Sequence, residues 1–222
     1  MGSGDRDAGQ RRHALPPVCA ARHHAQKKTL IAREQPEDAR AAWRDEVAAL
    51  DPASLVFLDE TSTPTDLTPA HGRAPRGQRV VGRIPQRRWR TVTLLATLTP
   101  QGFGPSFQFE GALDRAIFTA YVERILVPAL RPGQIVILDN LSVHKSARAR
   151  AVIEAAGCQV RFLPTYSPDF NPIEQAFSQL KGRLRRAEAR SVAAIFAATA
   201  DAYPALTADH ARHYYRNAGY KL

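Results

Sequence analysis

Two short apolar runs, each ending in an aspartate, constrain the fold of this chain more than any other feature. Asp59 follows Leu55-Val56-Phe57-Leu58, and Asp139 follows Ile135-Val136-Ile137-Leu138. A continuous apolar run of this length, bounded by turn residues, is typical of a strand that is covered on both faces. We therefore predict an α/β fold in which helices cover a sheet and both aspartates lie at strand ends.

Three carboxylates become candidates for a metal site in such a fold. Asp59 and Asp139 would lie at the carboxyl ends of neighbouring strands, where ligands gather in open α/β sheets. Glu174 lies just inside a helix that we expect to begin at Asn171-Pro172. Buried carboxylates repel one another and are costly to desolvate, and Mg²⁺ is held by one or two carboxylates together with substrate phosphates. The pattern therefore indicates metal-dependent phosphoryl transfer.

Three sequence blocks surround these carboxylates. They are Leu58-Asp59-Glu60-Thr61, then Leu138-Asp139-Asn140 followed by His144, then Leu163-Pro164-Thr165-Tyr166-Ser167-Pro168-Asp169-Phe170-Asn171-Pro172-Ile173-Glu174. The blocks, and the spacing between the second and third carboxylates, resemble those of bacterial insertion-sequence transposases of the mariner-related superfamily. Residues 71–77 belong to the same resemblance, which runs from about Lys27 to the C terminus.

The resemblance implies an RNase H-like fold, an α/β architecture with a mixed sheet flanked by helices. It also implies a DDE triad in which Asp59, Asp139 and Glu174 are catalytic and hold two Mg²⁺ ions, with Mn²⁺ as the alternative metal. Asp59 would bridge both ions. Two ions about 3.5 to 4 Å apart stabilise the attacking and leaving oxygens of an in-line displacement. The implied activity is cleavage of insertion-sequence ends and their transfer into target DNA.

Three residues are predicted to support the triad: Asn140, His144 and Asn171. Asn140 either orients Asp139 or contacts a phosphate. His144 either faces the metal site or is a satisfied, partly buried histidine. Glu60 is left out of the triad because successive side chains of a strand point to opposite faces.

Glu174 also has a purely structural interpretation. With Asn171 as N-cap and Pro172 at the first helical position, Glu174 falls at the third, where a carboxylate caps the helix. The rest of the helix favours a functional role, because Lys181 and Arg185 follow Glu174 on one flank, where we expect them to contact DNA phosphates. The adjacent stripe is apolar and predicted to be buried: Ile173, Ala176, Phe177, Leu180 and Leu184.

The charge of the chain points to a polyanionic partner. The formal net charge is +10, and residues 71–90 contain seven arginines and no acidic residue. We expect this run to bind the phosphates of double-stranded DNA, through Arg73, Arg76, Arg87, Arg88 and Arg90, and the alternative is a solvated loop. No apolar stretch is long enough to span a membrane and none resembles a secretory signal, so we expect a cytoplasmic, nucleoid-associated bacterial protein.

The expected organisation has three parts: a flexible basic arm at 1–35, a linker helix at 36–53 and a catalytic domain at 54–222. Three strands, the last near residues 106–109, should precede a helix over 113–130, the second apolar strand, a helix over 145–156 and a strand over 159–163. Relatives usually carry a helix-turn-helix region ahead of the catalytic domain. We therefore expect a catalytic half whose end recognition comes from an upstream reading frame or a helix-turn-helix partner, acting as a homodimer on DNA.

Two other functions remain open at this point. One is an RNase H-like nuclease or resolvase that hydrolyses DNA without strand transfer. The other is a non-catalytic DNA-binding protein derived from a transposase, which the intact set of three carboxylates argues against.

Overall fold

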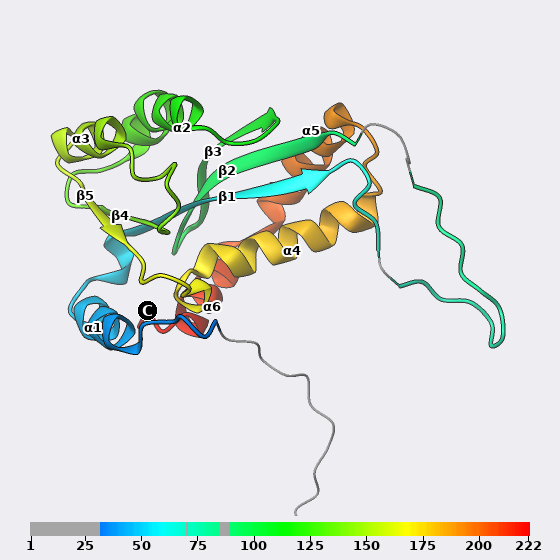
Figure 1. Cartoon of the computed structure of the whole chain (residues 1–222), viewed down its shortest axis with the longest axis horizontal. Helices are drawn as coiled ribbons and strands as arrows, with labels where there is room; N and C mark the ends of the chain where they lie inside the picture. Colours follow the sequence, from blue (N-terminus) through cyan, green and yellow to red (C-terminus); the bar gives the residue numbers. More distant parts are fainter. Residues whose placement is uncertain (1–31, 70, 85–88) are drawn as a thin grey trace, which may run out of the picture. The chain divides into compact units, whose positions relative to one another are not determined.

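The computed structural model describes residues 32–69, 71–84 and 89–222. At its centre is a five-stranded sheet with the order β3-β2-β1-β4-β5 (Figure 1). β1 pairs antiparallel with β2 and parallel with β4, so the predicted mixed sheet is confirmed. The strands are β1 (Leu55–Pro64), β2 (Thr91–Thr99), β3 (Gly102–Glu110), β4 (Ile135–Leu138) and β5 (Gln159–Phe162).

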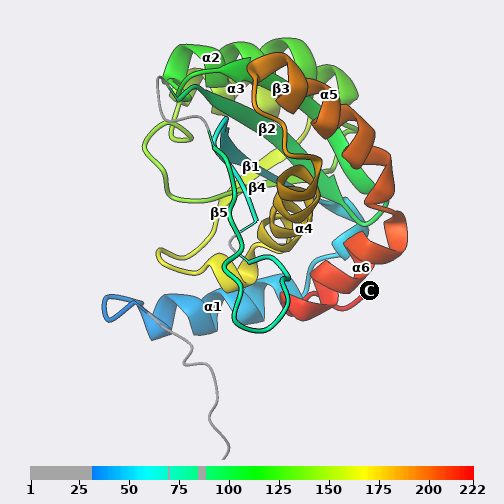
Figure 2. The same cartoon turned by 90° about the vertical axis from the view of Figure 1, so that its right-hand side faces the viewer.

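Helices cover both faces of this sheet (Figure 2). One face is covered by α2 (Arg115–Tyr121), the turns that follow it and α3 (Ala147–Ala155), and the other by α4 (Pro172–Ala187), α5 (Val192–Ala202) and α6 (Ala208–Asn217). The two apolar runs supply both cores by alternation: Phe57 and Ile137 pack toward α4 and α6, whereas Leu58 and Leu138 pack toward α2 and α3. This alternation is why both runs are apolar without interruption.

The helix predicted over 113–130 is present but changes its hydrogen-bonding type in its second half. The α-helix ends at Tyr121 and continues as a π-helical turn over Val122–Leu126 and a 3₁₀ turn over Val127–Ala129. Pro128 lies in that last turn, where it has no backbone N–H to continue the α-helical hydrogen bonds. The start is well defined, because Asp114 accepts a hydrogen bond from the backbone N–H of Ile117 over 2.7 Å.

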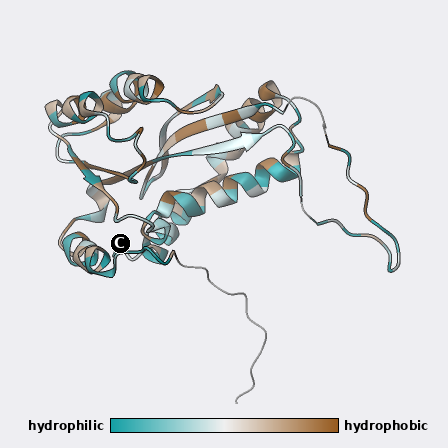
Figure 3. Cartoon of the chain, viewed as in Figure 1, coloured by the Kyte–Doolittle hydropathy of each residue, from teal (hydrophilic) through white to brown (hydrophobic). Residues whose placement is uncertain are grey.

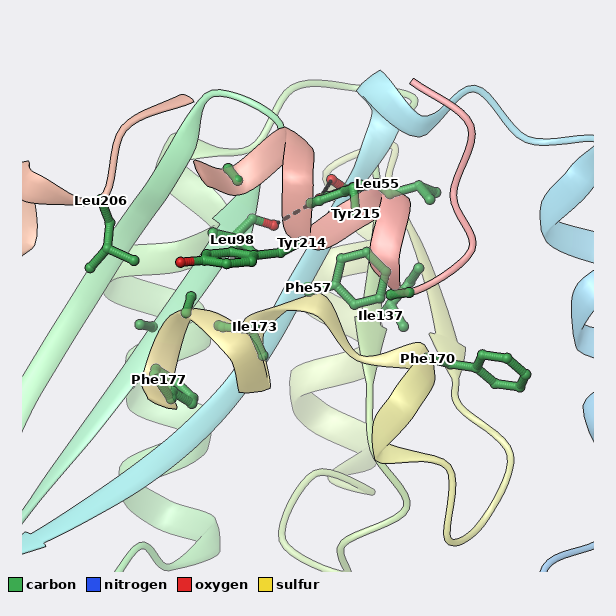
Figure 4. Packing of buried hydrophobic residues seen from close by; sticks show 14 of the residues in the cluster. Leu55, Phe57, Leu98, Ile137, Phe170, Ile173, Phe177, Leu206, Tyr214 and Tyr215 are labelled. Carbon is green, nitrogen blue, oxygen red and sulfur yellow. Dashed lines mark hydrogen bonds between the residues drawn. The ribbon is translucent and has the colours of Figure 1, made fainter. Parts of the chain in front are cut away.

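The core on the α4 side is joined to the sheet by a buried tyrosine of α6. The hydroxyl of Tyr215 lies 2.9 Å from the carbonyl oxygen of Leu55 and 3.0 Å from that of Leu98 (Figure 4). Its ring packs edge-on against Phe57, with 5.2 Å between centroids. Figure 3 shows hydrophobic colours along β2 and hydrophilic colours recurring along α4, whose apolar stripe is buried as predicted.

The predicted helix that precedes the sheet is present as α1 (Glu37–Ala48). Trp43 of α1 is buried and donates a hydrogen bond from Nε1 to the Tyr220 hydroxyl over 3.3 Å. These contacts place α1 in the same compact unit, residues 32–222, as the sheet. Most of the expected basic arm, residues 1–31, lies outside the described residues, and the division at residue 53 stays a prediction. No helix in the described ranges is long and apolar enough to cross a membrane.

Candidate active site

The three predicted carboxylates line one pocket of about 460 Å³. Asp59 lies on β1, Asp139 directly follows β4, and Glu174 lies in the first turn of α4. β1 and β4 are parallel neighbours with Phe57 opposite Ile137, so Asp59 and Asp139 each come two residues after the same register pair. The pocket is also lined by Asn140, Leu141, Leu163, Pro164, Thr165, Tyr166, Ser167, Pro168 and Asn171.

Asp59 is the most buried of the three carboxylates, with 7% of the residue exposed. Its Oδ2 accepts a hydrogen bond from Asn171 Nδ2 over 2.8 Å, and its Oδ1 accepts one from the backbone N–H of Glu60, also over 2.8 Å. Burial, followed by the charges of Glu60, Glu174 and Asp139, raises the pKa of Asp59 to about 8. A bound cation is the direct way to keep such a carboxylate ionised.

Asp139 is more exposed and is held by donors from its own loop. Its Oδ1 accepts hydrogen bonds from the backbone N–H of Leu141 over 2.9 Å and from His144 Nδ1 over 2.6 Å. Burial opposes ionisation here, but the hydrogen bonds from His144 and Leu141 outweigh it and lower the pKa of Asp139. Asp139 therefore ionises more readily than an ordinary aspartate, through contacts within the protein itself.

His144 connects Asp139 to a fourth carboxylate. The histidine is 2% exposed, its ring centroid lies 4.9 Å from that of Phe118, and its Nε2 lies 2.8 Å from Glu60 Oε2. The last contact is an ion pair without a hydrogen bond. Burial alone would lower the pKa of His144, but the contacts with Asp139 and Glu60 raise it to about 9. The buried ring is thus a cation between two carboxylates.

Glu60 was not among the predicted site residues. Alternation along β1 does place it on the face opposite Asp59, and it does not line the pocket. Through His144 it is nevertheless linked to Asp139. The adjacent pair Asp59-Glu60 and the histidine after Asp139 are visible in the sequence, but their meeting depends on how the loop after β4 folds back.

Glu174 occupies the third position of α4, as the cap interpretation requires, but the cap does not form. Asn171 is the N-cap residue and makes no side-chain cap hydrogen bond, because its amide is directed to Asp59. Burial raises the pKa of Glu174; Lys181 acts in the opposite direction, and Asp139 and Glu60 add to the rise. Glu174 lines the pocket, and its helix begins without a side-chain cap.

The predicted supporting residues all lie at this site. Asn140 donates a hydrogen bond from Nδ2 to the carbonyl oxygen of Leu163, which ties the end of β4 to the loop after β5. Asn171 orients Asp59, and His144 orients Asp139. Of the two alternatives left open for Asn140, the contact that the structure shows is with the loop and not with the carboxylate.

The loop between β5 and α4 is held by α1 and by Gln35 just before it, through contacts that the sequence did not predict. Arg40 donates two hydrogen bonds to Asp169, over 2.9 and 2.7 Å, and its guanidinium lies 4.3 Å from the centre of the Phe170 ring. Gln35 Nε2 donates to the carbonyl oxygen of Tyr166 over 2.7 Å. In the sequence, the only signal for this contact is Arg40, a charged residue at a helix position that would otherwise face the core.

None of the predicted DNA-binding residues that the structure describes lines the pocket. Lys181 and Arg185 follow Glu174 along α4. Arg73 and Arg76 are exposed, in the segment between β1 and β2 that extends away from the sheet (Figure 1). Arg90 is paired with Glu110 of β3, so its charge is partly compensated. The remaining two, Arg87 and Arg88, lie outside the described residues.

The donor set of the pocket suits a hard divalent cation, because three carboxylates supply only oxygen ligands. In the part of the chain that the structure describes, no three Asp, Glu, His or Cys side chains are gathered closely enough to hold one ion by themselves. Mg²⁺ commonly uses one or two carboxylates and completes its shell with water and phosphate. The oxygen donors of the pocket therefore fit a divalent cation whose shell is completed by water and phosphate.

Residues 54–195 match a protein family described as DDE superfamily endonuclease. No curated protein sequence matches the chain.

Solved structures of Mos1 transposase have a similar fold. The Mos1 strand transfer complex aligns with a TM-score of 0.69 at 18% identity, over 89% of this chain and 62% of that one. The mariner Mos1 paired-end complex with Mg aligns with a TM-score of 0.67 at 15% identity, over 89% and 63%. The Mos1 catalytic domain aligns with a TM-score of 0.57 at 13% identity, over 87% and 91%. The expected RNase H-like fold is confirmed, and the chain spans less than two thirds of the first two relatives.

Proposed function

Because the chain belongs to the DDE superfamily of endonucleases, we propose that it is the catalytic part of a DNA transposase, which cleaves phosphodiesters at element ends and joins them to target DNA. The observation that carries the proposal is the shared pocket of Asp59, Asp139 and Glu174, with Asp59 buried and its pKa raised to about 8. Asp59 is buried near three other carboxylates, those of Glu60, Asp139 and Glu174. This burial is costly in free energy unless a cation compensates the charge.

Asp59, Asp139 and Glu174 are the residues that would hold the metal, which we propose to be two Mg²⁺ ions, or Mn²⁺ in their place. Bound ions would supply Lewis-acid stabilisation of the attacking and leaving oxygens. The charges of both Glu174 and Asp139 act on Asp59, which supports it as the residue that would be shared between the ions. Solved Mos1 complexes with Mg and with Mn support this choice of metals.

The remaining residues of the site have positioning roles. Asn171 fixes the rotamer of Asp59, and His144 with the Leu141 amide fixes Asp139 in its ionised form. Asn140 holds the loop that closes the pocket. Preorganised ligands of this kind reduce the reorganisation needed when substrate binds.

Double-stranded DNA is the proposed substrate and partner. Lys181 and Arg185 extend from Glu174 along α4 and would follow the phosphate backbone, and Arg73, Arg76, Arg87, Arg88 and Arg90 would add contacts from the segment before β2. The net charge of +10 supports a polyanionic partner. We propose that the protein acts in the bacterial cytoplasm, associated with the nucleoid.

The wider assembly is part of the same proposal. Residues 54–222 would form the catalytic domain, 36–53 a linker helix and 1–35 a basic arm. End recognition would come from a helix-turn-helix partner or an upstream reading frame, and two copies would act together on DNA. Solved Mos1 paired-end and strand transfer complexes support a paired arrangement.

One pair of assays tests the proposal. Supercoiled plasmid with Mg²⁺, Mn²⁺ or EDTA measures metal-dependent nicking, and labelled oligonucleotides with free 3′-hydroxyl ends, incubated with plasmid, measure strand transfer. We expect both activities, and we expect Asp59→Asn and Asp139→Asn to lose both while still binding DNA. Nicking without joining would indicate a nuclease or resolvase. DNA binding with neither activity would indicate a non-catalytic protein.

A further inference from the structure

Arg40 is a buried charged residue that lies outside the carboxylate pocket. It belongs to α1, is 7% exposed and does not line the pocket. Its Nη1 and Nη2 atoms donate to the two carboxylate oxygens of Asp169 over 2.9 and 2.7 Å, the bidentate geometry that suits arginine. Well-packed apolar residues often stabilise a fold as much as a buried ion pair does. Stability alone therefore does not account for this arginine.

The turn that Arg40 contacts is held at several points. Asp169 and Phe170 both belong to the 3₁₀ turn Pro168–Phe170. The Arg40 guanidinium also lies 4.3 Å from the centre of the Phe170 ring, a distance at which a cation is attracted to an aromatic face. The carbonyl oxygen of Phe170 accepts a hydrogen bond from the Tyr220 hydroxyl over 2.8 Å. The turn is thus fixed through two side chains and one backbone carbonyl.

Two functional groups of the site follow this turn directly in the chain. Asn171 is the next residue, and its amide donates to Asp59 Oδ2 over 2.8 Å. α4 begins at Pro172 and carries Glu174 in its first turn. A hydrogen bond between N–H and oxygen weakens when its heavy atoms are more than about 3.2 Å apart. A displaced turn would therefore release Asp59 and move the start of α4.

From these contacts we propose that Arg40 is a positioning residue for the carboxylate site, which it reaches through Asn171 and Asp59. The inference rests on the proposed function, which assigns a metal to the carboxylates. Arg40 lies outside residues 54–195, the segment that matches the family. The metal ligands would thus depend on α1, which precedes the expected catalytic domain. Arg40 would raise their affinity for a divalent cation without contacting that cation.

The sign of one measured change separates positioning from simple electrostatics. If Arg40 acted only as a positive charge, its removal would strengthen the binding of a cation to nearby carboxylates. If Arg40 positions the ligands, its removal weakens that binding. Arg40→Met removes the charge and leaves an unbranched, adaptable apolar side chain in its place. It does not leave a buried charge behind, because the side chain of Asp169 is 54% exposed.

Three further variants complete the set. Arg40→Lys keeps the charge but cannot form the bidentate pair. Asp169→Asn removes the charge on the other side of that pair. Arg161→Met is the matched control, because Arg161 of β5 pairs with Glu46 of α1 over 3.1 Å and also contacts Gln159. It therefore breaks another ion pair of α1 and removes one positive charge without removing a contact to the turn.

Mn²⁺ binding to the full chain is measured without DNA, by the loss of the EPR signal of the free ion, and urea denaturation in EDTA verifies folding. Arg40→Met should bind Mn²⁺ about tenfold more weakly than wild type, a typical effect of removing an outer-shell partner. Arg40→Lys and Asp169→Asn should also bind more weakly. Combining Arg40→Met with Asp169→Asn should add little, because both remove one contact. Arg161→Met should bind as wild type does.

Equal or tighter Mn²⁺ binding by a folded Arg40→Met would overturn the inference, as would an equal loss in Arg161→Met. If Arg40→Met does not fold, binding by Arg40→Lys equal to that of wild type overturns it instead.

Plasmid nicking by the same wild-type preparation keeps the two proposals apart. Nicking by wild type, together with unchanged Mn²⁺ affinity in Arg40→Met, removes the positioning role alone. Mn²⁺ binding that depends on Arg40, without metal-dependent nicking, removes the proposed function and supports the positioning role. A wild type that binds no Mn²⁺ overturns both.

Discussion

Asn171 donates a hydrogen bond from its side-chain amide to Asp59 Oδ2 over 2.8 Å, so the residue that begins α4 positions the carboxylate on β1. Both side chains are buried. The residue expected to cap its own helix instead links the first and third sequence blocks.

Removing that amide should destabilise the site without metal. Asn171→Ala leaves a buried carboxylate oxygen without its donor, and we expect a loss of about 1–3 kcal/mol in the free energy of unfolding. Urea denaturation in EDTA measures this loss. Asn217→Ala is the control, since its amide makes an exposed hydrogen bond to Gln175 over 3.0 Å, and it should change little. Equal effects of the two substitutions would contradict a special role for Asn171.

The metal-free protein should lose stability as pH rises. The pKa of His144 is raised from its ordinary 6.5 to about 9, so its stabilisation is complete below 6.5 and lost through about 9. The pKa of Asp59 is raised from 3.8 to about 8, which has the same sign, with stability lost as pH rises through about 8. Between 6.5 and 9 we expect a fall on the order of a few kcal/mol in the free energy of unfolding.

Mg²⁺ should reduce that fall, because a cation favours the ionised carboxylates. Melting temperatures across this pH range, with Mg²⁺ or EDTA, measure both effects. In Asp59→Asn the slope in EDTA should be shallower. A stabilisation by Mg²⁺ that does not increase with pH would count against a metal at Asp59.

His144 and Glu60 should be energetically coupled. Replacing His144 by Gln leaves Glu60 without its cationic partner, and we expect a loss of about 3 kcal/mol, as for other broken buried pairs. A double-mutant cycle with Glu60→Gln measures the coupling, which should exceed about 1 kcal/mol. Additive losses would show that the contact of 2.8 Å carries no interaction energy. Mg²⁺ titration of each variant, followed by melting temperature, reports whether Asp139 is displaced.

Glu174 should behave as a ligand and not as a cap. Glu174→Gln should change the free energy of unfolding in EDTA by less than about 1 kcal/mol, since the residue is exposed and the helix cap does not depend on it. Its stabilisation by Mg²⁺ and its nicking activity should fall sharply. Glu174→Asp keeps the charge on a shorter side chain and should recover part of the metal effect at most. Full nicking by the Gln variant would leave Glu174 with a structural role only.

The basic residues should differ in their contribution to DNA binding. Lys181→Ala with Arg185→Ala should flatten the slope of log K against log salt by up to about 1.8, at about 0.9 for each phosphate contact. Arg90→Ala should flatten it less than one full contact, because Arg90 is paired with Glu110. Arg212→Ala is the control, an arginine of α6 paired with Asp209 over 2.6 Å. Slopes that do not distinguish these variants would make α4 a solvated face.

The sequence predicted the strands that carry Asp59 and Asp139 because continuous apolar runs and turn residues are local signals. It also predicted the position of Glu174, since Asn-Pro marks a helix start in any context. It did not predict the contact between His144 and Glu60, nor the hydrogen bonds from Arg40 to Asp169. Those contacts join residues far apart in the chain. Their geometry depends on loop conformation, which hydrophobic periodicity does not predict. The π-helical turn after Tyr121 has no periodic signature in the sequence.

The hydroxyl of Tyr215, which is shared between Leu55 and Leu98, limits how far this chain can be shortened. The family match ends at residue 195, before α6, yet α6 and Tyr220 complete the apolar layer around Phe57, two residues from Asp59. A fragment cut at the family boundary would open that layer to water and leave two strand carbonyls without their shared donor. The smallest part of this chain that folds is therefore larger than the segment that matches the family. Expression of residues 54–195 alone should yield insoluble or unfolded protein.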